Sequence, residues 1–272
     1  PGRGYARGPH GLVHFQDGGG RVPVRAGERA LVLLHQSPSS SRQFEAAFEP
    51  LVARGIRFVA IDTPGFGFSD PTPSIPTVEQ WAPSIAAVLD HLGLDQVDAL
   101  GHHTGSLIAT ELALQYPRRV RRLVLNGPFP LTSAERTARL ERSEVTRVSD
   151  RPRLDGSHLL ETFQTRLRMY GPDPDLDAVT RGVALKYQAL GPHWWGHHAA
   201  YRYDHERSLR RLAQPTLIFT NTGDDLYDLA QRARTIRPDF AYLELQGGTH
   251  DIVDQQPAAW SDAVVGFLRR PQ

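Results

Sequence analysis

Residues 97–106 read Val-Asp-Ala-Leu-Gly-His-His-Thr-Gly-Ser, and this stretch decides the fold of the chain. An apolar, strand-like run ends at Gly101, and an apolar helical run, residues 107–114, begins just after Gly105. Because glycine lacks a Cβ atom, this pair allows a sharp turn and a close approach of the new helix to the sheet. The stretch therefore predicts a strand–turn–helix unit with His103 at the apex of the turn.

Strand-like and helical segments alternate on both sides of this unit. Strands are expected at residues 30–34, 58–61, 122–126, 216–220 and 241–245, and residues 30–34 form a continuous apolar run, typical of a strand buried on both faces. Helices are expected near residues 42–54, 78–92, 226–236 and 257–268. Short strands at 12–15 and 22–25, joined through Asp17-Gly18-Gly19-Gly20, are expected to form a hairpin. This alternation predicts an α/β protein whose parallel sheet is covered by helices on both faces.

The pattern changes between residues 128 and 212. Helical segments broken by Gly and Pro replace the strand–helix alternation there, and the strand pattern returns at residue 216. We therefore expect a core domain made of residues 1–127 and 213–272, with residues 128–212 inserted as a helical cap.

Composition narrows the classes of protein. The 272 residues carry a formal net charge of +1, 40% of them are hydrophobic, and none is cysteine. No apolar run reaches the roughly 18 residues that a membrane-spanning helix needs, and dispersed arginines give no reason to expect nucleic-acid binding. The absence of cysteine excludes disulfides and thiolate chemistry and fits a reducing compartment. We expect a cytoplasmic protein that acts on a small molecule as a monomer or homodimer.

Five motifs, in this order and at these spacings, carry a family resemblance. The chain resembles the α/β-hydrolase superfamily with a helical cap, of the dehalogenase and epoxide-hydrolase type. That resemblance implies a mostly parallel eight-stranded sheet flanked by helices, with the cap inserted. The motifs are His35-Gln36-Ser37-Pro38, the Asp62-x-Pro-Gly-x-Gly-x-Ser loop, Gly101-x-x-x-Gly105, Gly223-Asp224-Asp225 and Gly247-Gly248-Thr249-His250-Asp251.

The resemblance also implies roles for particular positions. The catalytic base falls on His250, and the acid falls on Asp225 or Asp224, of which Asp225 fits the usual register better. The oxyanion-hole donors would be the backbone N–H groups of Ser37 and Thr104. The nucleophile position falls on His103, where members of this superfamily carry serine, cysteine or aspartate.

An imidazole at this position leaves several chemistries open. A histidine can activate water for direct attack on an ester, lactone, thioester or activated C–C bond, or it can attack the carbonyl itself. The pair His103 and His250 can also move protons without hydrolysis, as in a lyase, cyclase, isomerase or cofactor-free oxygenase. A fourth reading is a catalytically silent ligand-binding protein. Hydrolysis, the default of the family, is the leading expectation.

No cofactor or metal is expected. Two histidines and a carboxylate are the ligand set of some iron and zinc sites. The resemblance, however, places the acid on the far nitrogen of the base, so the three groups would not converge on one point.

Other residues are assigned to the substrate pocket or to structural roles. Aromatic and polar side chains suggest a pocket roofed by the cap, which favours a cyclic or aromatic substrate. His102 is expected to be structural, and Asp62 is expected to hold its own loop. The residues expected to line the pocket are Gln36, Phe129, Trp195, His198 and Tyr201.

Overall fold

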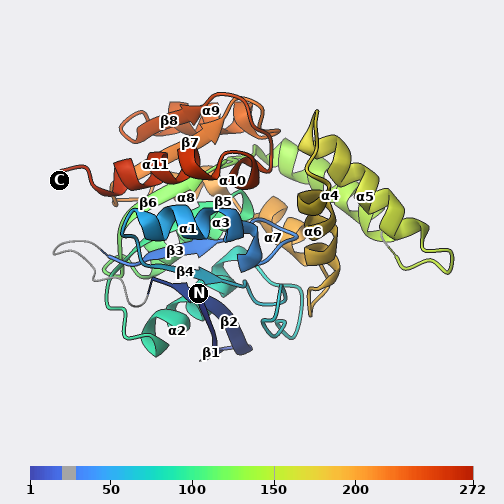
Figure 1. Ribbon diagram of the computed structural model, residues 1–272, viewed down its shortest axis with the longest axis horizontal. Helices are drawn as coiled ribbons and strands as arrows, with labels where there is room; N and C mark the ends of the chain where they lie inside the picture. The colour runs from blue at the N-terminus through green and yellow to red at the C-terminus, as the bar shows by residue number, and fades with distance from the viewer. Residues whose placement is uncertain (20–28, 150, 272) are drawn as a thin grey trace.

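A single eight-stranded sheet forms the centre of the molecule (Figure 1). The computed structural model describes residues 1–19, 29–149 and 151–271. The strand order is β1-β2-β4-β3-β5-β6-β7-β8; β2 runs antiparallel to β1 and β4, and the pairs from β4 to β8 are parallel. This confirms the expected mostly parallel, eight-stranded sheet. The strands are β1 Gly2–Gly8, β2 Gly11–Gly18, β3 Leu31–Leu34, β4 Phe58–Ile61, β5 Val97–His102, β6 Val120–Asn126, β7 Thr216–Asn221 and β8 Ala241–Leu245.

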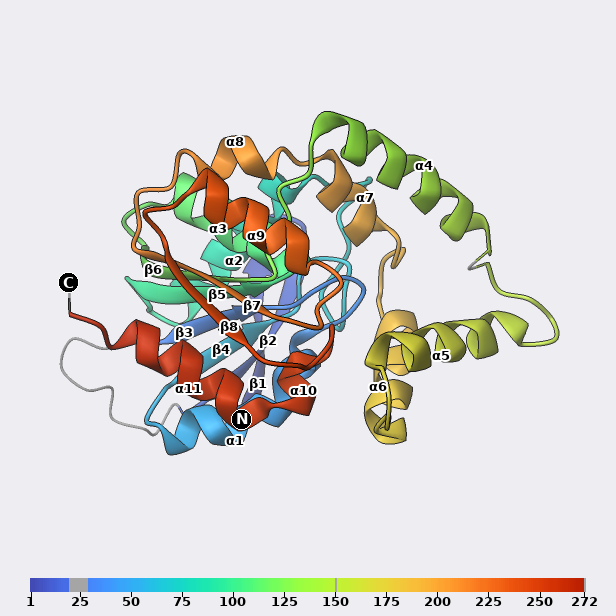
Figure 2. The same ribbon diagram turned by 90° about the horizontal axis from the view of Figure 1, so that it is seen from above.

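Helices cover both faces of the sheet. In Figure 2, α1, α10 and α11 lie on one face, and α2, α3, α8 and α9 lie on the other. The helices are α1 Glu45–Ala53 (after a 3₁₀ turn, Ser41–Phe44), α2 Val78–His91, α3 Thr104–Gln115, α4 Ser133–Ser149, α5 Ser157–Tyr170, α6 Leu176–Tyr187, α7 Trp195–Arg202, α8 His205–Leu209, α9 Tyr227–Ile236, α10 Ile252–Gln255 and α11 Pro257–Leu268.

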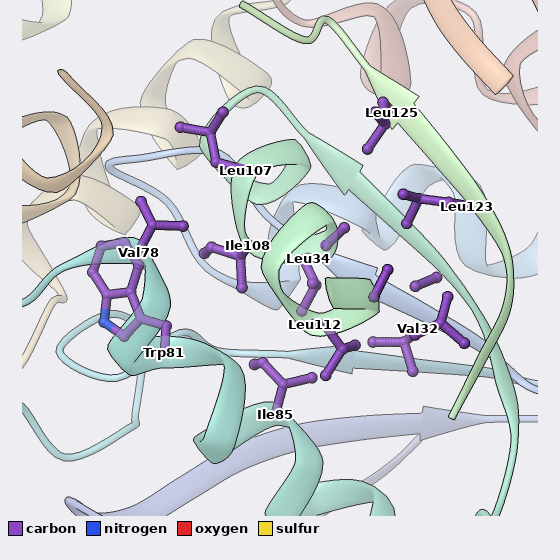
Figure 3. Close-up of a cluster of buried hydrophobic side chains, with 14 of the residues drawn as sticks. Val32, Leu34, Val78, Trp81, Ile85, Leu107, Ile108, Leu112, Leu123 and Leu125 are labelled. Carbon is purple, nitrogen blue, oxygen red and sulfur yellow. The ribbon is translucent and has the colours of Figure 1, made fainter. Parts of the chain in front are cut away.

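The apolar side chains of β3 pack against the helices on both faces of the sheet. Successive side chains of a strand point to opposite faces, so Leu31 and Leu33 join the cluster under α1 and α11. Val32 and Leu34 join the cluster under α2 and α3, which Figure 3 shows beside Trp81 and Ile108. Burial on both faces is the reason why this strand lacks polar alternation.

The N-terminal hairpin differs from the expected one. The strand expected at residues 22–25 lies outside the described residues, and β2 pairs with the preceding strand, β1. The sequence of β1, Gly-Arg-Gly-Tyr-Ala-Arg-Gly, has little of the apolar signal of a strand. Its Gly4 faces Phe15, where a Cβ atom would lie 2.6 Å from the aromatic ring. Packing against β2 thus explains a glycine that propensity alone would not place in a strand.

Helices α4 to α8 lie between β6 and β7 in the chain. Figure 2 shows α4, α5 and α6 extending away from the end of the sheet where β5 and β6 finish. The last part of this segment packs on the main domain, because Tyr203 and Leu209 belong to the same apolar cluster as α3. The boundaries 128–212 for a cap remain a prediction. None of the helices in the described ranges has the length and apolarity needed to cross a membrane.

Gly105 allows a test of the close packing of α3 against the sheet. A Cβ atom here would lie 2.0 Å from the carbonyl oxygen of Leu34, although position 105 is helical. We expect Gly105→Ala to lower the free energy of unfolding by about 3 kcal/mol, since the overpacking outweighs the better helix propensity of alanine.

The matched control is Gly266→Ala in α11, where a new Cβ atom meets no atom within 4 Å. We expect this change to be neutral or stabilising by up to about 1 kcal/mol. Urea denaturation of both variants measures the difference. Equal stability of the two variants would contradict the close helix–sheet approach at position 105.

Candidate functional site

The turn between β5 and α3 holds His103 in a strained conformation. Its backbone angles are φ 48° and ψ −111°, a region that non-glycine residues rarely occupy. The turn is fixed by two hydrogen bonds: the His103 N–H donates to the Asn126 carbonyl at 2.8 Å, and the Ser106 N–H donates to the His103 carbonyl at 2.8 Å. Strain of this kind persists only where the surroundings enforce it and is concentrated at active sites. The structure thus singles out His103.

His103 is paired with a buried carboxylate. Its Nε2 lies 2.8 Å from Oδ2 of Asp224, and both side chains are almost completely buried. A carboxylate only accepts hydrogen bonds, so the His103 Nε2–H is the donor. Burial by itself would raise the pKa of Asp224, but the positive charge of His103 and its hydrogen bond hold that pKa below its ordinary value. Gly127 lies against the pair: a Cβ atom there would be 2.3 Å from Cδ2 of His103.

The structure places Asp224, and not the preferred Asp225, against a histidine. Asp225 is exposed, whereas Asp224 is buried and also accepts the Leu226 N–H at 2.9 Å. The side chains of the adjacent residues Asp224 and Asp225, in the turn after β7, point in different directions. The sequence alone does not show which of them faces a histidine. The geometry therefore identifies Asp224, and not Asp225, as the carboxylate paired with a histidine, and the role of catalytic acid stays a prediction.

His250 lies beside this pair, and no carboxylate in the described part of the chain is paired with it. Its ring centroid is 4.6 Å from that of His103, in an edge-to-face arrangement. The Nδ1 atom of His250 is buried and has no hydrogen-bond partner among the described residues. The family resemblance implies that the acid bonds this base, but here the carboxylate bonds the ring at position 103 instead.

The surroundings of His250 keep its imidazole neutral. Burial, followed by the positive charges of His103 and Arg166, lowers its pKa well below the ordinary value of 6.5. A neutral imidazole has one nitrogen lone pair with which to accept a proton. His250 is therefore in the basic form near pH 7.

His102 completes a row of three imidazoles. Its ring centroid lies 4.3 Å from that of His103. The backbone N–H of Gln36 donates to Oε1 of Gln43 at 2.8 Å, which turns the Gln43 amide so that its Nε2–H donates to Nδ1 of His102. Because Nδ1 accepts this hydrogen bond, the proton of the neutral His102 ring is on Nε2.

This tautomer argues against a metal ion at the cluster. His102, His103 and Asp224 each offer an atom, and these atoms lie within 4.8 Å of one another. A metal ligand must present a lone pair, but Nδ1 of His102 is engaged by Gln43 and its Nε2 carries a proton. The donor set therefore does not fit a metal ion.

A cavity of about 600 Å³ lies between the sheet domain and helices α4 to α7. His250 is in its wall, whereas His103, with about 4% of its surface exposed, lies below the wall. The core, α7 and the residue before α7 contribute the following lining residues: Gln36, Ser37, His250, Trp194, His197 and Tyr201. Gln36 and Tyr201, both expected to line the pocket, thus lie in its wall, and Ser37, expected as an oxyanion donor, lies there too.

Three other expected pocket residues lie elsewhere. Phe129 is buried in the apolar core, and Trp194 and His197 line the cavity in place of Trp195 and His198. Neighbouring residues of a helix point about 100° apart, so an error of one position turns a side chain away from the cavity. The i, i+4 spacing of His197 and Tyr201, whose rings are stacked at 5.6 Å, is a signal that the sequence contained.

His197 connects α7 to the turn after β3. A hydrogen bond joins its ring to the backbone of Ser37. Burial, together with the charge of Lys186, lowers its pKa to about 4, so this ring is neutral near pH 7. A Cβ atom on Gly196 would lie 2.3 Å from Oγ of Ser37, and α7 therefore packs directly on the expected oxyanion turn.

The two residues expected to donate backbone N–H groups to an oxyanion, Ser37 and Thr104, lie near the end of a strand and at the start of a helix, respectively. Thr104 is the first residue of α3, where a backbone N–H has no acceptor within the helix, and Ser37 lines the cavity. The neighbouring Gln36 N–H is already bound to Gln43. The role of Ser37 and Thr104 in stabilising an oxyanion stays a prediction. Asp62 has the structural role expected of it, since it accepts the N–H groups of Ser41 and Phe68.

Comparison with known proteins identifies the family. The family model for the alpha/beta hydrolase fold matches residues 29–256. A 2-hydroxy-6-oxononadienedioate/2-hydroxy-6-oxononatrienedioate hydrolase of Pseudomonas putida is 38% identical over 119 residues, which are 42% of this chain and 40% of that protein. A 2-hydroxymuconate semialdehyde hydrolase of a Pseudomonas species is 40% identical over 88 residues, 30% of this chain and 31% of that protein. The matched segments thus span well under half of the length of these relatives.

Solved structures share the fold over almost the whole chain. A thermophilic esterase from Thermogutta terrifontis superposes with a TM-score of 0.77 at 20% identity, covering 99% of this chain and 98% of its own. The enol-lactonase of Burkholderia xenovorans superposes with a TM-score of 0.76 at 18% identity, covering 98% and 100%. At these identities the likeness concerns the fold alone.

The pairing of Asp224 with His103 predicts how stability depends on pH. Because its pKa is lower in the folded state, the carboxylate stabilises the fold above its unfolded pKa of about 4 and loses that contribution as the pH falls through the folded value. At pH 7 we expect Asp224→Asn to cost about 3 kcal/mol, as for other broken buried charge pairs. The cost should shrink below about pH 4.

The exposed neighbour supplies the control. We expect Asp225→Asn to change stability by less than about 0.5 kcal/mol at any pH. Urea midpoints of both variants, measured from pH 7 to pH 2, test this. A larger loss in Asp225→Asn than in Asp224→Asn would show that the wrong carboxylate has been assigned.

Proposed function

Because the chain belongs to the alpha/beta hydrolase fold family, we propose that it is a hydrolase in which an imidazole activates water directly, without a serine nucleophile. Its substrate is a small carbonyl compound: an ester, lactone, thioester or activated C–C bond. One observation carries this proposal. Asp224 is engaged by His103, which leaves His250 as a neutral ring in the wall of the cavity.

The reaction follows from the placement of these groups. His250 takes a proton from a water molecule as the water oxygen attacks the substrate carbonyl. The backbone N–H groups of Ser37 and Thr104 stabilise the negative charge that develops on the carbonyl oxygen. When the intermediate collapses, the protonated His250 returns its proton to the leaving group. The products are an acid and the protonated leaving group, and the enzyme is regenerated.

His103 and Asp224 support this chemistry as a pair. A proton shared by this pair lowers the pKa of His250 and so opposes protonation of the base before water is activated. The pair also fills the position from which a nucleophilic hydroxyl would attack. The hydrolysed bond is therefore broken without an acyl-enzyme at the turn.

The family supports hydrolysis over proton transfer alone. The relatives that match this chain over part of their length are named as hydrolases of oxo-dienoate and semialdehyde compounds. Their substrates are carbonyl compounds, as this proposal requires.

Loss of the base provides the first test. We expect His250→Ala to lower kcat for 4-nitrophenyl acetate by a factor of about 10² to 10⁴, the usual contribution of a general base. Asp225→Asn, on the exposed side of the turn, should retain full activity. Since the pKa of His250 is lowered, wild-type kcat should remain on its plateau as the pH falls through 6.5. Unchanged turnover in His250→Ala would refute the assignment of the base.

A second test addresses the missing nucleophile. We expect a fluorophosphonate probe to leave the wild type unlabelled and to label His103→Ser. In that variant Asp224 loses its partner and becomes available to His250, as in a serine hydrolase. The control is the double variant His103→Ser/Asp224→Asn, which should react more slowly by a factor of about 10² or more. Labelling of a serine in the wild type, detected by mass spectrometry, would contradict direct activation of water.

A further inference from the structure

Helix α5 carries an arginine into the cavity wall, beside the segment that holds the proposed base. Arg166 lines the cavity together with His250, and its Nη2 donates a hydrogen bond to Oδ1 of Asp251 at 2.5 Å. Asp251 directly follows His250 in the chain. A side chain of α5 therefore reaches the residue next to the imidazole.

Packing fixes the guanidinium group of Arg166. The side chain is 18% exposed, and its Nε is buried without a hydrogen-bond partner in the part of the chain that the structure describes. A Cβ atom on Gly182 of α6 would lie 2.9 Å from this Nε, so α6 packs directly against the guanidinium group. Arg166 is thus held between α6 and Asp251 rather than extended into solvent.

Arg166 compensates a buried negative charge. The Asp251 side chain is 5% exposed, and its Oδ2 is buried without a hydrogen-bond partner among the described residues. A carboxylate in such a place is tolerated only beside a cation. The other carboxylate near the base, Asp224, is bound to His103. Neither carboxylate is therefore paired with His250, and loss of the Arg166 guanidinium would leave an uncompensated negative charge beside the ring.

The imidazole of His250 is surrounded by groups that can carry positive charge. Burial lowers its pKa most, and the charges of four side chains lower it further. Three of the four are imidazoles, which lose their charge as the pH rises above about 6.5, whereas a guanidinium keeps its charge. Arg166 is therefore the constant part of the field that opposes protonation of the base. The four side chains are those of His103, Arg166, His102 and His197.

We propose that Arg166 is a positioning residue for the base. It acts on His250 in two ways: it holds the segment 249–251 through Asp251, and its permanent charge keeps the imidazole in the neutral form that accepts a proton from water. Arg166 takes no part in proton transfer itself, since a guanidinium offers no lone pair. This proposal rests on the hydrolase activity proposed above.

A titration of His250 tests the effect of this charge without turnover. The readout is the ring Cε1–H NMR signal of protein labelled with carbon-13 histidine, assigned by its loss in His250→Gln. We expect the wild-type ring to stay neutral as the pH falls through 6.5, because its pKa is lowered. In Arg166→Gln the midpoint should move to higher pH by about one pH unit, because a positive charge is removed and the charge of Asp251 is left uncompensated. An unchanged midpoint would overturn the proposal.

Two further variants separate charge from loop structure. Arg166→Lys keeps the positive charge and should titrate like the wild type. Asp251→Asn breaks the ion pair but keeps the Arg166 charge, so the midpoint should not move to higher pH. A merely structural role predicts the same upward movement in Asp251→Asn as in Arg166→Gln, because both changes break the link, and this outcome would also refute the proposal.

Controls address folding and specificity of the effect. Arg168→Gln on α5, whose side chain is exposed and outside the cavity wall, should titrate like the wild type. Where Arg166→Gln alone does not fold, the double variant Arg166→Gln/Asp251→Asn takes its place. It leaves neither charge of the pair buried, and the same upward movement of the midpoint is expected.

The kinetics of hydrolysis test the positional part of the proposal. For 4-nitrophenyl acetate we expect the plateau kcat of both Arg166→Gln and Asp251→Asn to fall about tenfold, with KM within about threefold, because both release the segment that aligns the base. The acid limb of kcat should move to higher pH in Arg166→Gln alone. Wild-type plateau values in both variants would show that the ion pair does not position the base.

The two readouts keep this proposal distinct from the proposed activity. A His250 midpoint that moves in Arg166→Gln, while the acid limb of kcat stays in place, would show that His250 is not the base. That result would refute the proposed function and leave the action of Arg166 on the ring established. A midpoint that does not move refutes the role of Arg166, whatever the esters show.

Discussion

The hydrogen bond between Asp224 and His103 is the interaction on which the rest of the site depends. A buried carboxylate is tolerated only with a partner that compensates its charge, and the residue at the apex of the turn provides that partner. Because Asp224 is engaged by His103, the pKa of His250 is set by burial and by the charges of its neighbours. The neutral imidazole in the cavity wall is thus a consequence of where this carboxylate is engaged.

The sequence determined much of the fold because its signals were local and repeated. The strand at 241–245 and the helix at 257–268 were predicted to the residue, since a short hydrophobic segment that follows a helix and a proline at the start of a helix leave few alternatives. The first strand was not predicted, because its glycines lack strand propensity and the contact that explains Gly4, with Phe15, is made across the sheet. Long-range contacts of this kind leave no periodic pattern in the chain.

The sequence predicted which segments contribute to the site, but it did not predict which way the individual side chains point. The motifs brought residues 37, 103 and 250 together, and the structure places 103 and 250 in ring contact. The choice between Asp224 and Asp225, and between Trp194 and Trp195, depended on which way adjacent side chains point. The α4 residues 139, 142 and 147, which also line the cavity, were not predicted, because helical spacing alone does not show which element lies opposite that face of the helix. A row of charged residues on one face of a helix can be assigned to a pocket only when the element opposite that face is known.

The ion pair between Arg166 and Asp251 has a mechanical consequence. Arg166 is part of α5 and of the cavity wall, and Asp251 directly follows His250. The end of α5 is joined to the same segment by further contacts, because the Tyr170 carbonyl accepts hydrogen bonds from Thr249 and Gln255. Any outward movement of α5 would therefore stretch these contacts or displace the segment that holds the His250 imidazole, so the position of the cavity wall and the orientation of this ring are geometrically coupled.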